Sequence, residues 1–123
     1  MKKNIMIVDD DPDCRNSVKQ ALESMDNEYE VICVSSGIQC LELLKNKEFP
    51  DLILLDIMMP GMSGWATYDK IKENDMWKNI PIVFLTARTD KVAKKAGDIL
   101  GDEYIEKPAQ IPQIKEKIEK LLK

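Results

Sequence analysis

Acidic residues follow two short apolar runs of this 123-residue chain, at the points where strands would end. Asp9 and Asp10 come directly after the run at residues 4–8, and Asp56 comes directly after the run at residues 52–55. Short apolar runs bounded by acidic, Pro and Gly residues are typical of strands buried on both faces of a parallel sheet. Parallel strands end at one edge of their sheet, where α/β proteins place the ligand crevice. We therefore predict that the three carboxylates share this crevice.

Three carboxylates in one crevice need a positive counter-charge, because two of them about 4 Å apart repel by roughly 4 kcal/mol at an effective dielectric of 20. An oxygen-only ligand set favours Mg²⁺. Thr86 follows the fourth predicted strand and Lys107 follows the fifth, so a hydroxyl and an amine are expected at the same edge. A carboxylate beside a metal and a lysine is equipped to act as a nucleophile and form an aspartyl phosphate. These residues therefore indicate phosphoryl acceptance at Asp56.

Five repeats of a strand followed by a helix position these residues. The predicted strands cover residues 4–8, 29–34, 52–55, 82–85 and 103–106. This alternation predicts a doubly wound, all-parallel sheet of five strands with right-handed crossovers. The alternating pattern of the second strand places it nearer the sheet edge. We expect one domain over residues 1–123, with no effector domain in the chain.

Two predicted helices have recognisable local signals. Asp11 followed by Pro12 is typical of a helix start, because the carboxylate caps free N–H groups and Pro suits the first helical position. Ile38, Leu41 and Leu44 recur at helical spacing, which predicts that they share one face of the second helix.

The composition excludes several functions. A net charge of −4 argues against non-specific nucleic-acid binding. The chain lacks both a long apolar run and a signal peptide, so we expect no membrane contact and a cytoplasmic location. Three cysteines without a CxxC pair, in a chain without histidine, are expected to be reduced and mostly buried rather than zinc-binding. Without histidine, any phosphohistidine donor must be another chain.

Four stretches resemble the receiver domain of two-component response regulators, the fold of the single-domain chemotaxis regulator. They are VDDDP at residues 8–12, LDIMMPGMSG at 55–64, LTA at 85–87 and YIEKP at 104–108. The resemblance covers the whole chain, and each stretch falls at a predicted strand end. It implies a flavodoxin-like (βα)5 fold whose five parallel strands have the order 2-1-3-4-5.

The resemblance implies a role for each residue of the crevice. Asp56 is similar to the phosphoacceptor, and Asp10 resembles a direct Mg²⁺ ligand that Asp9 assists through water. The backbone carbonyl of Met58 resembles a further ligand, which together with Asp56 completes the protein's contribution to the metal. Lys107 resembles the lysine that binds the phosphoryl group.

The resemblance also implies a switch and its partners. Thr86 and Tyr104 resemble the pair whose hydroxyl and aromatic ring move on phosphorylation, which changes the face formed by the fourth helix, fifth strand and fifth helix. A sensor histidine kinase is the implied phosphoryl donor, and a downstream protein is the implied partner of that face. The domain is expected to be a monomer or a phosphorylation-dependent dimer. It is expected not to be an enzyme, beyond slow self-dephosphorylation.

Three alternatives stay open from the residues. A Mg²⁺-dependent phosphatase with an aspartyl nucleophile would want a second Asp two positions after Asp56, where Met58 stands. A flavin-binding electron carrier would want a phosphate-binding loop after the first strand, where three aspartates stand instead. The third alternative is an unphosphorylated protein-interaction module of the same fold, and the acidic residues together with Lys107 argue against it.

Overall fold

The strands and helices alternate along the chain in this computed structural model, which describes residues 2–24, 28–57, 59–86, 104–106 and 111–122. The strands are β1 (Lys3–Val8), β2 (Tyr29–Val34), β3 (Leu52–Asp56), β4 (Ile82–Thr86) and β5 (Tyr104–Glu106). The helices within these residues are α1 (Pro12–Glu23), α2 (Gly37–Lys45), α3 (Gly64–Glu73) and α5 (Ile111–Leu122).

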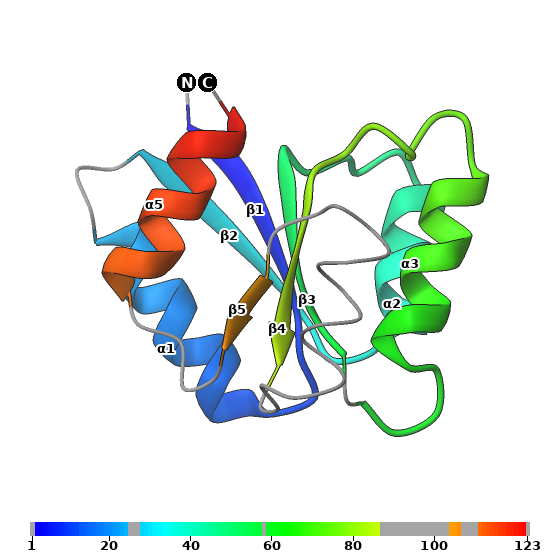
Figure 1. The fold of residues 1–123 in the computed structure, drawn as a ribbon, viewed down its shortest axis with the longest axis horizontal. Helices are drawn as coiled ribbons and strands as arrows, with labels where there is room; N and C mark the ends of the chain where they lie inside the picture. Colours follow the sequence, from blue (N-terminus) through cyan, green and yellow to red (C-terminus); the bar gives the residue numbers. More distant parts are fainter. Residues whose placement is uncertain (1, 25–27, 58, 87–103, 107–110, 123) are drawn as a thin grey trace.

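The five strands form a parallel sheet with the order β2-β1-β3-β4-β5 (Figure 1). The prediction of a flavodoxin-like parallel α/β sheet is confirmed, and β2 lies at its edge as the alternating pattern indicated. The helix predicted between β4 and β5 lies outside the described residues, so the complete set of five strand–helix repeats stays a prediction.

Helices cover both faces of the sheet, with α1 and α5 on one side and α2 and α3 on the other (Figure 1). The core is divided in the same way. Met6 and Val8 belong to the cluster under α2 and α3, whereas Ile5 and Ile7 belong to the cluster under α1 and α5. This alternation within β1 follows from the two-residue period of a strand. It explains why the central strands read as continuous apolar runs: residues 52–55 of β3 are all fully buried.

The helix starts follow from local capping. Asp11 caps α1 by accepting a hydrogen bond from the backbone N–H of Asp13 at 3.0 Å, and Pro12 occupies the first position, as predicted. Ser36 and Ser63 cap α2 and α3 in the same way. Each such cap contributes about 1 kcal/mol to helix stability.

The prediction that Ile38, Leu41 and Leu44 share one face is wrong for Ile38 and Leu44. Leu41 and Leu44 are buried, but Ile38 is 56% exposed. Each step of three residues falls about 60° short of a full turn, so Ile38 lies about 120° around the helix from Leu44. Cys40, which is fully buried, takes the core position beside Leu41 instead.

The cysteines agree with their interpretation as small apolar side chains. Cys40 is buried, and burial raises the pKa of its thiol to about 12. Cys33 is half-buried, and burial raises the pKa of that thiol also. Both thiols are therefore held in the neutral form. Among the described helices, none combines the length and the apolar character that crossing a membrane requires.

Candidate metal centre

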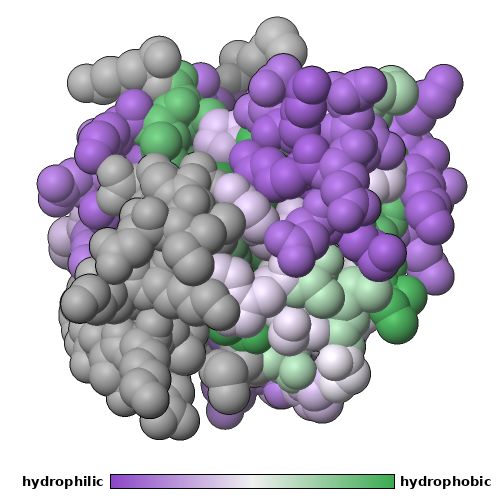
Figure 2. All heavy atoms as spheres, turned by 45° about the vertical axis from the view of Figure 1, so that its right-hand side comes forward, coloured by the Kyte–Doolittle hydropathy of each residue, from purple (hydrophilic) through white to green (hydrophobic). Residues whose placement is uncertain are grey.

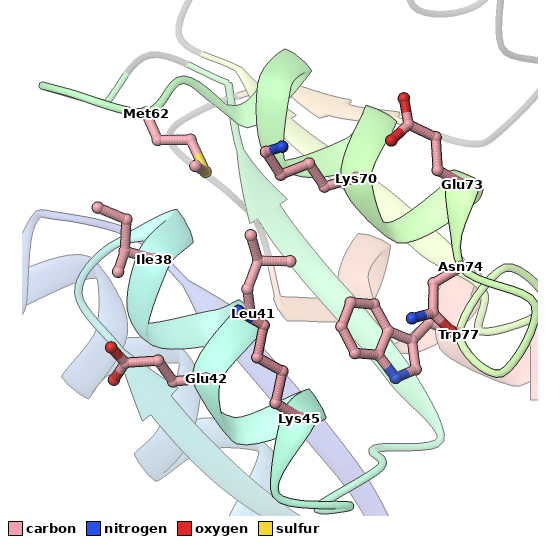
Figure 3. Close-up of a pocket in the computed structure, with 9 residues that line it drawn as sticks. All are labelled: Ile38, Leu41, Glu42, Lys45, Met62, Lys70, Glu73, Asn74 and Trp77. Atoms are coloured by element: carbon pink, nitrogen blue, oxygen red, sulfur yellow. The ribbon is translucent and has the colours of Figure 1, made fainter.

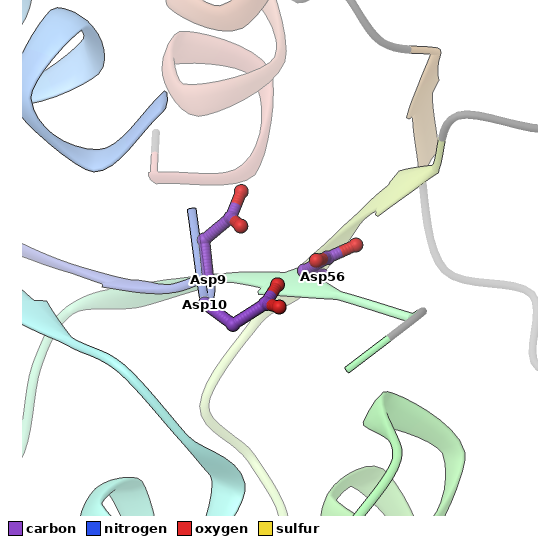
Figure 4. Close-up of side chains that lie close together, drawn as sticks. All are labelled: Asp9, Asp10 and Asp56. Carbon is purple, nitrogen blue, oxygen red and sulfur yellow. The ribbon is translucent and has the colours of Figure 1, made fainter. Parts of the chain in front are cut away.

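Asp9, Asp10 and Asp56 come together at the carboxyl ends of β1 and β3. One carboxylate oxygen of each lies within 4.8 Å of the others. Figure 4 shows the three side chains close together at the ends of the two strands. The reason lies in the register, since Val8 of β1 is aligned with Leu55 of β3 and the next residue of each strand is acidic. The structure therefore brings together the three carboxylates that the sequence placed at this edge.

The three carboxylates differ in exposure. Asp9 is fully buried and Asp56 is 3% exposed, whereas Asp10 is exposed. Two charges about 5 Å apart repel by roughly 3 kcal/mol at an effective dielectric of 20, and burial adds a cost for ionised Asp9 and Asp56. A bound cation would offset both costs. The oxygen donors fit Mg²⁺, which is held by one or two carboxylates and keeps several water or substrate ligands on its open side.

Backbone hydrogen bonds hold the loop from β1 to α1 in place. The Asp9 N–H donates to the carbonyl of Val34 on β2 at 3.1 Å. The Asp9 Oδ1 accepts from the Asp11 N–H at 2.9 Å. Asp11 therefore fixes Asp9 through its backbone and α1 through its side chain, which agrees with its predicted capping role.

Arg15 also contacts this loop, and no sequence motif singled it out. Its guanidinium Nη1 donates to the backbone carbonyl of Asp9 at 2.6 Å. The sequence feature that could have indicated this contact is the position of Arg15 in the first turn of a predicted helix. A long side chain at such a position can reach back over the loop that precedes the helix.

Gly64, the first residue of α3, lies against the backbone of Asp56. Its N–H donates to the carbonyl of Ile57 at 2.9 Å. A Cβ added at Gly64 would overlap the carbonyl oxygen of Asp56 and lie 2.7 Å from the Cα of Ile57. A side chain at position 64 would therefore displace the strand end that carries the predicted phosphoacceptor.

The remaining predicted site residues are described in part or not at all. Thr86 ends β4 and is aligned with Glu106 of β5, and Tyr104 is aligned with Phe84, two residues before Thr86. The structure describes the backbone of Thr86 and Tyr104 but not their side chains. Met58 and Lys107 lie outside the described residues, so the predicted carbonyl ligand and phosphoryl-binding amine stay predictions.

A separate groove of about 530 Å³ lies between α2 and α3 (Figure 3). Its lining includes Leu41, Met62 and Trp77, and none of the three clustered aspartates takes part in it. Figure 2, which turns this side of the molecule forward, shows a group of hydrophilic side chains at its upper right and less polar side chains below them. The groove is therefore distinct from the acidic centre.

Comparison with known proteins agrees with this architecture. Residues 5–119 match the response regulator receiver domain. The chain is 38% identical over 109 residues to the uncharacterized transcriptional regulatory protein YrkP of Bacillus subtilis, a match that covers 88% of this chain and 44% of that protein. The chain spans 25%, 44% and 55% of the lengths of three curated relatives, so it matches only a part of each.

Solved structures give the same result. The N-terminal domain of a response regulator receiver protein from Methanoculleus marisnigri is 39% identical, with a TM-score of 0.73 and coverage of 97% of this chain and 95% of that one. The chemotaxis protein CheY4 of Vibrio cholerae is 26% identical, with a TM-score of 0.85 and coverage of 99% and 100%. Because the family match extends over nearly the whole chain and the fold agrees, this chain belongs to the response regulator receiver domains of two-component signalling systems.

Proposed function

We propose that this domain accepts a phosphoryl group on Asp56 in a Mg²⁺-dependent reaction and thereby acts as a signalling switch. The observation that carries the proposal is the convergence of Asp9, Asp10 and Asp56 within 4.8 Å at the strand ends of a receiver domain. Asp56 suits the nucleophile because it ends the central strand β3, whose position is fixed by neighbours on both sides.

The acidic residues differ in their proposed roles in binding Mg²⁺. Asp10, Asp56 and the backbone carbonyl of Met58 would hold the ion directly, and Asp9 would assist through a water molecule. When bound, Mg²⁺ supplies positive charge that offsets the negative charge on the phosphoryl oxygens in the transition state. Lys107 and Thr86 bind the same oxygens by their ammonium and hydroxyl groups.

The proposed phosphoryl donor is a phosphohistidine of a sensor histidine kinase, the donor that the receiver-domain family implies, and this sequence contains no histidine of its own. A carboxylate oxygen of Asp56 attacks phosphorus, a P–O bond forms and the P–N bond breaks. The electron pair of the broken bond stays on the imidazole nitrogen, which takes up a proton. Asp56 then carries an acyl phosphate, which water hydrolyses slowly. The domain is thus a phosphoacceptor and not an enzyme that turns over a metabolite.

In this proposal, phosphorylation changes the face formed by the fourth predicted helix, β5 and α5. The Thr86 hydroxyl moves toward the phosphoryl group and the Tyr104 ring turns inward, which changes that face for a downstream protein or for a phosphorylation-dependent dimer. A cytoplasmic location fits a chain that exchanges phosphoryl groups with a kinase.

The test is incubation with acetyl phosphate and Mg²⁺, followed by intact mass measurement. We expect the wild type to gain the mass of one phosphoryl group, and Asp56→Asn to gain none. Asp69→Asn is the matched control, because Asp69 is an exposed acid on α3 away from the cluster, and it should label like the wild type. Wild-type protein that gains no mass, or Asp56→Asn that labels normally, contradicts the proposal. Catalytic turnover of a simple phosphate ester would instead favour the phosphatase alternative.

A further inference from the structure

The side chain of Arg15 reaches from α1 to the loop that carries the acidic cluster. We infer that Arg15 is a positioning residue, which orients Asp10 for Mg²⁺ by holding the peptide bond between Asp9 and Asp10. This inference rests on the proposed function of the cluster as a Mg²⁺ site. It adds a residue outside the ligand set on which the affinity and ion selectivity of that site depend.

The contact falls on the peptide unit that leads directly to Asp10. Arg15 Nη1 donates to the Asp9 carbonyl at 2.6 Å, a short, charge-assisted hydrogen bond. Because a peptide unit is planar, the direction of this carbonyl also sets the direction of the following Cα. The hydrogen bond from the guanidinium therefore helps to fix the position of the Asp10 Cα, from which the Asp10 side chain extends.

The carboxylate of Asp10 depends on its backbone more than that of Asp9 does. Asp9 is fully buried and its Oδ1 accepts a hydrogen bond from the Asp11 N–H. Asp10 is exposed, so its side chain is less constrained by packing than that of Asp9. The peptide unit before Asp10 consists of the Asp9 carbonyl and the Asp10 N–H, and Arg15 holds the carbonyl of this unit.

Arg15 is itself fixed well enough to position another group. Its N–H donates to the carbonyl of Asp11 at 3.1 Å in the first turn of α1. The Cys33 thiol contacts its carbonyl at 3.9 Å, which ties this turn to β2. The side chain is half-buried, so water competes only in part for the hydrogen bond to Asp9. The loop is therefore held between a strand edge and a helix turn.

Positioning and simple charge have opposite effects on metal binding, which makes the inference testable. A cationic guanidinium near a cation site repels the ion, so removal of its charge alone would tighten Mg²⁺ binding. Loss of a positioning contact would instead weaken binding, by about 10- to 100-fold for an outer-shell partner. The loss should be larger for Mg²⁺, which demands near-octahedral geometry, than for Ca²⁺, whose coordination is flexible.

The experiment is isothermal titration calorimetry of the full chain with Mg²⁺ and separately with Ca²⁺. Arg15→Met keeps an unbranched stem but removes the donor. Lys19→Met, one turn later on α1, is the matched control because it removes the same charge and contacts Glu23 and Val31 instead of the acidic loop. We expect the Mg²⁺ dissociation constant to rise about 10-fold or more in Arg15→Met, with a smaller rise for Ca²⁺ and little change in Lys19→Met.

The outcomes separate the two proposals. Wild-type protein that binds no Mg²⁺ overturns both. Two outcomes with a wild type that binds Mg²⁺ overturn only the role of Arg15. In the first, Arg15→Met binds Mg²⁺ as tightly as the wild type or more tightly. In the second, its affinities for Mg²⁺ and Ca²⁺ fall by the same factor. If circular dichroism shows that Arg15→Met is unfolded, Arg15→Lys decides. The charge is unchanged in Arg15→Lys, so a Mg²⁺ affinity that falls more than the Ca²⁺ affinity supports positioning by the guanidinium, and wild-type affinity for both ions contradicts it.

Discussion

Lys19 and Glu23, one turn apart on α1, form an ion pair of 3.0 Å that spans the backbone polar groups of a single residue of β2. Lys19 Nζ donates to the Val31 carbonyl at 2.9 Å, and Glu23 Oε2 accepts from the Val31 N–H at 3.0 Å. Because β2 is an edge strand, these two side chains supply the partners that a further strand would provide. The ion pair therefore connects α1 to the sheet and covers part of its open edge.

Replacement of Glu23 by Ala is expected to destabilise the domain. The Val31 N–H loses its acceptor and Lys19 loses its ion-pair partner. These two losses together should lower the free energy of unfolding by about 1–2 kcal/mol. Urea denaturation followed by circular dichroism measures this loss. Glu116→Ala, an exposed acid on α5, is the control and should change stability much less. Equal effects of the two substitutions would show that the contact with Val31 contributes nothing.

The same carboxylate predicts a pH dependence of stability. The hydrogen bond from the Val31 N–H, followed by the one from Lys19, holds the pKa of Glu23 below its ordinary value of 4.5. A carboxyl group with a lower pKa in the folded state stabilises the fold above its unfolded pKa, and this contribution is lost as the pH falls through the folded pKa. The difference in unfolding free energy between the wild type and Glu23→Gln should therefore be constant near neutral pH and shrink below 4.5. A difference that grows on acidification would contradict this assignment.

Gly64→Ala should damage the acidic centre as well as the fold. The new Cβ would overlap the Asp56 carbonyl, so the backbone must shift at an expected cost of about 1–3 kcal/mol. Gly61→Ala is a close control, because a Cβ there has no neighbour within 4 Å and the cost is only the strain of a φ of 74°. We expect acetyl phosphate to label Gly64→Ala more slowly than Gly61→Ala. Equal labelling would mean that the contact with Asp56 does not affect the site.

Asp10→Asn should have opposite effects on thermal stability with and without Mg²⁺. Without Mg²⁺, removing one of three clustered negative charges relieves repulsion and should raise the melting temperature. With Mg²⁺, the wild type gains stability from binding, while the variant, in which a neutral amide replaces one carboxylate, gains less. Thermal denaturation in EDTA and in excess Mg²⁺ checks both signs. A variant that gains as much from Mg²⁺ as the wild type would show that Asp10 is not a ligand.

The sequence by itself determined the placement of the acidic centre. Continuous apolar runs indicate central parallel strands, and the residue after such a run must lie at the carboxyl edge of the sheet. The order of apolar and acidic residues is therefore sufficient to assign Asp9, Asp10 and Asp56 to one crevice. The cap formed by Asp11 was equally accessible, because it depends on hydrogen bonds within three residues of the chain.

Only the tertiary structure decided the contacts that depend on how helices dock onto the sheet. The contacts of Lys19 and Glu23 with Val31 join residues that are 12 and 8 positions apart, across a loop whose path the sequence pattern does not specify. The exposure of Ile38 depends on the rotation of α2 about its axis, and a three-residue spacing leaves that rotation open. The hydrogen bond from Arg15 to Asp9 likewise depends on the rotamer of a long side chain, which the packing of α1 against β2 selects. Hydrophobic periodicity places residues on a face or at an edge, whereas polar contacts are directional and short, so docking geometry determines them.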